Sequence, residues 1–141
     1  MGLLRPKAKG DKYEREVAKY LDEILYDEEF QKILRAPLSG GGRSFQGGGS
    51  ADITGTPDIW VEAKRTEKFS PYASIEQAEK GKAAQRAPEM PAVFSRRNRM
   101  ETKESLVVMR AEDWVKLYKA YLIQKGHKIK DEDRKSTRLN S

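Results

Sequence analysis

The residues best suited to chemistry lie in segment 59–65, where Glu62 and Lys64 are separated by one residue. This segment is rich in β-forming residues. Because alternate side chains of a strand share a face, Glu62 and Lys64 should lie side by side. An isolated pair of this kind is most often an ordinary surface ion pair. Here, however, a predicted hairpin brings Asp52 or Asp58 alongside Glu62, and a glycine-rich segment precedes that hairpin.

Two carboxylates that converge at a strand end form a site for a hard cation such as Mg²⁺ or Mn²⁺, completed by a main-chain carbonyl and waters. Such a cation lowers the pKa of its bound water and offsets charge on a phosphate. A neighbouring lysine can orient or help deprotonate that water. The chain has no cysteine and one histidine, His127, which excludes thiol and Cys-ligated metal chemistry and argues against histidine-dependent hydrolases.

The elements that must position these residues are predicted from hydrophobic spacing. A helix is expected from Asp11, which with Glu14 resembles a capping box, to about Tyr26. Glu14 falls inside the apolar stripe of this helix, so it either caps the first turn or has an inward-facing partner. Strands are expected at 51–54, 59–65, 91–95 and 105–109, and further helices from Ser74 to before Pro88 and from about Ala111. This order predicts an α/β fold with a mixed central β-sheet flanked by helices.

A length of 141 residues fits one domain, predicted to span 10–125. Residues 1–9 are expected to form a basic arm and 126–141 a disordered tail that ends in a cloning scar. Half of residues 39–50 are glycine, without the ending of a nucleotide-binding P-loop, so no nucleotide cofactor is expected. No apolar run approaches the roughly 18 residues of a membrane span. We therefore expect no membrane partner and a cytoplasmic location.

The charge balance points to a polyanionic partner. The chain carries 28 Lys and Arg against 22 Asp and Glu, a net charge of +6. Segment 80–103 is strongly basic and includes Arg96-Arg97-Asn98-Arg99 at an expected turn between strands. A turn of this composition suits contacts to phosphates, although a solvated charged surface is the simpler interpretation.

Asp52, the run Glu62-Ala63-Lys64 and the helix with Glu14 resemble the active site of the PD-(D/E)XK nuclease superfamily, most closely the archaeal and phage Holliday junction resolvases of the Hjc type. Residues 9–14 (Lys-Gly-Asp-Lys-Tyr-Glu) resemble the glutamate motif of those enzymes. Arg35 with the later Ser39-Gly40, the pair Asp52-Ile53, and Gln77 on the next helix follow in the family's order. The likeness covers about residues 9–122. The family's hairpin favours Asp52 over Asp58, but the literal dipeptide Pro57-Asp58 leaves both open.

The resemblance implies a restriction-endonuclease-like core in the order α-β-β-β-α-β. It implies a metal-dependent, structure-selective endonuclease of DNA recombination and repair, encoded by a phage or an archaeon, which resolves four-way junctions by paired nicks as a homodimer. The metal, Mg²⁺ or Mn²⁺, would be held by Glu14, Asp52, Glu62 and the carbonyl of Ala63. Lys64 would be catalytic; for Gln77 a helix cap beside Ser74 is an equal alternative to a catalytic role.

The residues implied to contact DNA are basic or hydroxyl-bearing: Lys9, Lys12, Arg35, Ser39, Arg43, Arg65, Lys68, Arg96, Arg97 and Arg99. Two other functions stay open. One is a related nuclease acting on duplex, flap or single-stranded DNA, and the other is a catalytically silent DNA-binding accessory protein.

Overall fold

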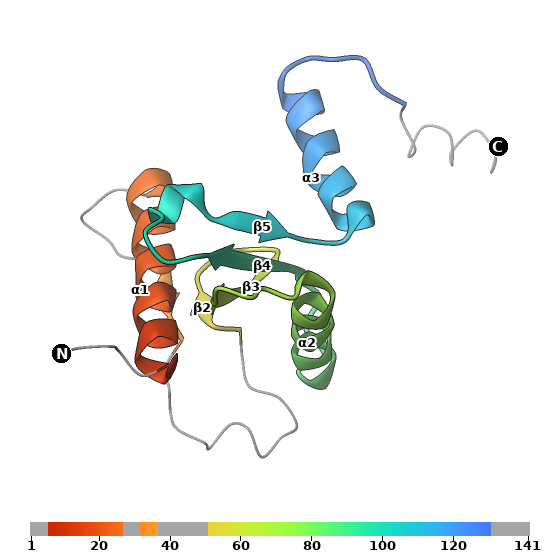
Figure 1. The fold of residues 1–141 in the computed structure, drawn as a ribbon. Coiled ribbons are helices and arrows are strands. Elements are labelled where there is room, and N and C mark those ends of the chain that lie inside the picture. The colour runs from red at the N-terminus through yellow and green to blue at the C-terminus, as the bar shows by residue number, and fades with distance from the viewer. Residues whose placement is uncertain (1–5, 27–31, 37–50, 131–141) are drawn as a thin grey trace. The chain divides into compact units, whose positions relative to one another are not determined.

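The structure, a computed structural model, describes residues 6–26, 32–36 and 51–130. Its elements are α1 (Pro6–Leu25), β1 (Leu34–Arg35), β2 (Ile53–Thr54), β3 (Ile59–Arg65), α2 (Pro71–Ala84), β4 (Met90–Arg96), the short 3₁₀ helix η2 (Thr102–Glu104), β5 (Leu106–Val108) and α3 (Ala111–Gln124). The described strands form one sheet in the order β1-β2-β3-β4-β5 (Figure 1). Because β3 and β4 are parallel and the other pairs antiparallel, the sheet is mixed. The prediction of an α/β chain with a mixed sheet flanked by helices is confirmed at this level.

The predicted and observed boundaries of the strands agree best at the centre of the sheet. β3 has the predicted bounds, and β4 and β5 lie within a residue of theirs. α1 begins at Pro6 rather than Asp11, so part of the expected arm is helical and Asp11 does not cap the helix; proline is well tolerated in a first turn. α2 also begins early, after Ser70, so Ser74 is a buried helical residue and not a cap. Residues 1–5, segment 39–50 and most of the expected tail, 131–141, lie outside the described residues.

Two helices pack on opposite faces of β3 (Figure 1). Val61 and Ala63 share a buried cluster with residues of α1, whereas Trp60 shares another with residues of α2. Side chains of a strand alternate between its faces, so this division follows from parity. The even-numbered residues Trp60, Glu62 and Lys64 are therefore on the face of β3 that α2 covers in part.

Asp22 ties the end of α1 to the start of β1. Its side chain is buried, and its Oδ1 accepts the backbone N–H groups of Lys32 and Ile33, each at 2.9 Å. A buried carboxylate needs such donors because its desolvation is otherwise uncompensated. This contact holds the short edge strand β1 against the helix.

Gly55, which follows β2, is required by both space and backbone conformation. A Cβ at this position would lie 1.8 Å from the carbonyl oxygen of Lys32, and φ is +90°. We expect Gly55→Ala to lower the free energy of unfolding by at least about 2 kcal/mol, because strain and overlap add. Gly10→Ala is the matched control: it lies in α1, its Cβ would meet nothing within 4 Å, and the substitution should be neutral or slightly stabilising. Urea denaturation of both variants tests this, and equal stabilities would contradict it.

The chain divides into two compact units, residues 1–109 and 110–141. α3, which was expected to form part of the domain at 10–125, belongs to the second unit. Within that unit the rings of Trp114 and Tyr118 stack with centroids 4.9 Å apart, and Tyr118 stacks on Tyr121 at 6.4 Å. Among the described helices, none combines the length and the apolar character that crossing a membrane requires.

A candidate carboxylate site on the central strand

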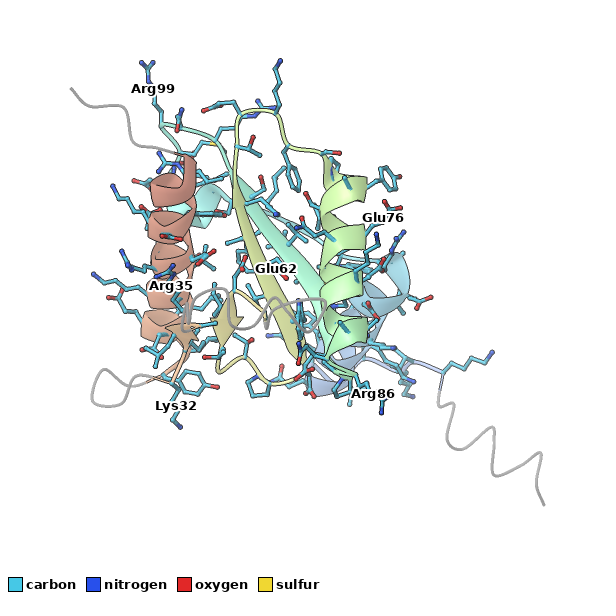
Figure 2. All side chains as sticks on the ribbon, turned by 90° about the horizontal axis from the view of Figure 1, so that it is seen from below. Lys32, Arg35, Glu62, Glu76, Arg86 and Arg99 are labelled. Atoms are coloured by element: carbon cyan, nitrogen blue, oxygen red, sulfur yellow. The ribbon has the colours of Figure 1, made fainter. Side chains whose placement is uncertain are left out.

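Asp52 lies immediately before β2, beside Glu62 of β3. Ile53 of β2 pairs with Val61 of β3, and Asp52 N–H also donates to Val61 O, at 3.0 Å. From this position the Asp52 carboxyl reaches the Ala63 N–H and lies close to the Glu62 carboxyl. Figure 2 shows Glu62 on β3 between α1 and α2.

Each of the two carboxyl groups has one oxygen held by a fixed donor. Asp52 Oδ2 accepts the backbone N–H of Ala63 at 2.9 Å, and Glu62 Oε1 accepts the indole Nε1–H of Trp60 at 2.9 Å. The Asp52 carboxyl also lies within hydrogen-bonding reach of the Glu62 carboxyl. A hydrogen bond between two carboxyl groups requires a proton on one of them.

This environment explains the protonation of Glu62. Burial, the largest cause, and next the hydrogen bond and charge of Asp52 raise the pKa of Glu62 from 4.5 to about 9. The Trp60 N–H and the positive charge of Lys64 act in the opposite direction, which also places Lys64 close to the site. At neutral pH Glu62 therefore keeps its proton when no cation is bound.

Asp58 has a different setting. It is exposed in the turn before β3, and its φ of 69° lies in the left-handed region that Asp tolerates better than most residues. The geometry thus favours Asp52 over Asp58 as the partner of Glu62.

The Ala63 peptide completes the donor set. β2 does not extend as far as Ala63, so the Ala63 N–H has no backbone partner in β2. It donates instead to the Asp52 carboxyl. In a strand, the N–H and C=O of one residue point to the same neighbour. The Ala63 carbonyl therefore points to the side on which Asp52 lies, and the site offers two carboxylates and a carbonyl, which are ligands that Mg²⁺ and Mn²⁺ prefer.

Glu14 pairs with Arg35 and not with Asp52 or Glu62. Its Oε1 accepts Arg35 Nε–H at 2.8 Å, and Arg35 Nη2 also pairs with Asp11 at 2.9 Å. Burial raises the pKa of Glu14, the Arg35 hydrogen bond opposes this, and the charge of Asp52 raises it again. Glu14 is therefore within electrostatic reach of Asp52, but in the described part of the chain no three His, Cys, Asp or Glu residues gather closely enough to hold a metal ion.

Two arginines that were predicted to contact DNA, Arg96 and Arg35, form ion pairs within the protein. Arg96 is 7% exposed, its Nη2 pairs with Glu16 at 2.6 Å, and its guanidinium lies 5.3 Å from the ring centroid of Tyr13. Arg35 bridges two acidic residues of α1, as described above, with only 13% of its side chain exposed. Both arginines thus hold α1 against the sheet. Their side chains are therefore not available to contact phosphates, contrary to the prediction.

The other predicted residues divide by position. Arg97 and Arg99 are exposed on the turn after β4, and Lys12 and Lys68 are exposed as well. Arg65 Nη2 donates to Asn98 Oδ1 at 3.0 Å, and Asn98 N–H donates to Glu67 at 2.8 Å, so the turn is fixed to the end of β3. Gln77 is exposed on α2. Ser39, Arg43 and the side chain of Lys9 lie outside the described residues.

Two residues have contacts that the sequence did not predict, Trp60 in the carboxyl site and Glu16 on α1. Trp60 shares the Glu62 face by parity, a signal that was visible, but its hydrogen bond to the carboxyl was not predicted. Glu16 forms an ion pair with Arg96, which is 80 residues away in sequence, and no local sequence pattern predicts such a pair.

No protein-family model matches the chain, and neither a curated protein nor a solved structure is significantly similar to it.

Proposed function

We propose that this protein is a metal-dependent DNA endonuclease with a restriction-endonuclease-like core. The observation that carries the proposal is the Asp52–Glu62 carboxyl pair, formed between the residue before β2 and the middle of β3, with Lys64 close by. The core elements α1, β1, β2, β3, α2 and β4 follow the α-β-β-β-α-β order that the resemblance implies.

Asp52, Glu62 and the Ala63 carbonyl are the groups that would hold a divalent cation. When bound, such a cation supplies Lewis-acid stabilisation of phosphate charge and acidifies water. Lys64 lies beside Glu62 and would orient the attacking water toward the phosphodiester. Glu14 would act at longer range, through its charge and through its contact with Arg35.

The substrate class follows from the resemblance and from charge. We infer a four-way junction as the preferred DNA, cut by paired symmetric nicks. Two such nicks require two active sites, and one chain offers one, so we infer a homodimer. Arg97 and Arg99 project from an anchored turn near the carboxyl end of β3, and Figure 2 shows Arg99 at one end of the molecule's first unit, beyond Glu62 along β3.

Removing the two exposed arginines of this turn should weaken DNA binding without affecting the carboxyl site. We expect Arg97→Ala with Arg99→Asn to lower affinity for DNA of any sequence and to reduce the slope of log affinity against log salt by about 1.8. Asn is chosen because Arg99 has φ 67°, which Asn tolerates. Arg15→Ala with Lys19→Ala removes the same charge from exposed positions of α1 and is the control. Fluorescence anisotropy across a salt series measures both, and equal slopes for the two variants would contradict the assignment.

The test of function uses an end-labelled four-way junction and a linear duplex of matching sequence, each with Mg²⁺, Mn²⁺ or EDTA. We expect paired nicks in the junction arms with metal and none with EDTA. Lys64→Ala, purified identically, should bind the junction but not cut it, which excludes a contaminating nuclease.

Other results have defined meanings. Equal cutting of the duplex would replace the junction resolvase by a general nuclease of the same chemistry. Junction binding without cutting in either metal would overturn the enzymatic proposal in favour of a silent DNA-binding protein. Unchanged cutting by Lys64→Ala would remove Lys64 from the mechanism.

A further inference from the structure

The contact between Trp60 and Glu62 joins the core to the carboxyl site. Trp60 is 6% exposed, and its ring is packed among small and aliphatic side chains: Ala51, Ile75, Ala78 and Val93. An indole N–H can only donate a hydrogen bond. Its acceptor, at 2.9 Å, is Oε1 of Glu62, two residues further along the same face of β3.

This hydrogen bond restricts a side chain that would otherwise have several rotamers. Glu62 has three side-chain torsions, and the Trp60 donor is fixed by the packing of its ring. With Oε1 held there, the second carboxyl oxygen is left for Asp52, whose own Oδ2 is held by the Ala63 N–H. Two immobile donors thus direct the remaining oxygens of the two carboxyl groups toward each other.

We propose that Trp60 is a positioning residue for Glu62: its indole N–H fixes one carboxyl oxygen so that the other stays directed at the cation site beside Asp52. The inference rests on the proposed function, because the value of this orientation is the binding of a divalent cation. A phenylalanine could fill most of the same space, so core packing alone does not require an indole here.

Trp60→Phe tests the inference because it keeps a buried ring and removes the donor. We expect the Mg²⁺ concentration for half-maximal cutting to rise about 10- to 100-fold, the usual effect of removing a group that orients a metal ligand. The rate at saturating Mg²⁺ should change much less. Trp114→Phe, on α3, is the matched control and should leave the Mg²⁺ dependence unchanged.

A second measurement does not depend on cutting or on the folding of the Trp60 variant. The chain has two tryptophans, so Trp114→Phe leaves Trp60 as the sole emitter. We expect Mn²⁺, a paramagnetic quencher, to decrease Trp60 emission in a saturable manner. In the Trp114→Phe/Glu62→Gln protein, which retains an acceptor for the indole, the saturable decrease should be lost.

The outcomes separate the two proposals. An unchanged Mg²⁺ dependence of cutting in folded Trp60→Phe would overturn the positioning role and leave the nuclease intact. Saturable quenching in a protein that cuts no DNA would support the coupling of Trp60 to a cation at Glu62 and overturn the nuclease. Quenching that is neither saturable nor sensitive to Glu62→Gln would overturn the positioning role.

Discussion

Asp52→Asn should abolish metal-dependent cutting, with a loss of more than about 100-fold, whereas Asp58→Asn should cut at nearly the wild-type rate. The reason is position: the Asp52 carboxyl lies beside that of Glu62 and accepts the Ala63 N–H, whereas Asp58 is exposed in the turn before β3. Replacing a residue that merely orients a ligand usually lowers metal affinity or activity 10- to 100-fold, so replacing a ligand should do more. Single-turnover cutting of a labelled junction measures both variants.

Asn is a fair replacement at both positions. At Asp52 it retains an oxygen that can accept the Ala63 N–H, so the end of β2 should stay in place. At Asp58 it tolerates the left-handed backbone, where φ is 69°. Strong loss with Asp58→Asn and near-normal cutting with Asp52→Asn would reverse the assignment and disprove the site described above.

Glu62→Gln should stabilise the metal-free protein relative to the wild type as pH rises, while eliminating metal-dependent cutting. The folded-state pKa of Glu62, about 9, lies above the ordinary value of 4.5 because the carboxyl is buried beside Asp52. Its protonated form therefore contributes stability that is fully present below about pH 4.5 and is lost as pH rises through 9. Glutamine keeps the shape and a hydrogen bond but never ionises.

Urea denaturation of both proteins at pH 5, 7 and 9, in EDTA, measures this effect. The free energy of unfolding of Glu62→Gln minus that of the wild type should increase across this range by at least about 1.4 kcal/mol, the equivalent of one pKa unit. Taking the difference removes titrations that the two proteins share. A difference independent of pH would show that Glu62 is already ionised and would refute the shared proton.

The same proton sets the direction of the pH dependence of activity. Hard cations bind ionised carboxylates, so the Mg²⁺ concentration needed for half-maximal cutting should fall as pH rises from 6 to 9. The apparent Mg²⁺ affinity, taken from cutting at each pH, tests the direction, and an affinity that falls with rising pH would contradict it.

The sequence predicted the central strand well for a physical reason. In β3, apolar Val61 and Ala63 alternate with Glu62 and Lys64, and this period of two fixes both the element and the shared face. The Asp52 assignment needed the hairpin that spacing suggested, and in the structure the Asp52 carboxyl lies beside that of Glu62.

Other features depended on partners remote in sequence. Arg96 lies in a basic run and is therefore expected at the surface, but Glu16 and the ring of Tyr13 allow its burial. Arg35 was expected at a phosphate and instead joins Asp11 and Glu14. α1 and α2 begin before the residues that the capping patterns indicated, and each begins at a proline, Pro6 and Pro71, a residue suited to the first turn of a helix.

The brevity of β2 has a consequence for local opening of the sheet. Because this strand ends before it reaches Ala63, the Ala63 amide is protected from solvent by a side chain, Asp52, rather than by a neighbouring backbone. Amides that donate across the ladder between β3 and β4 have a backbone partner and no such dependence. Hydrogen exchange at Ala63 should therefore follow excursions of the Asp52 carboxyl and should accelerate in Asp52→Ala, so this one amide reports how often the site opens while the rest of the sheet stays closed.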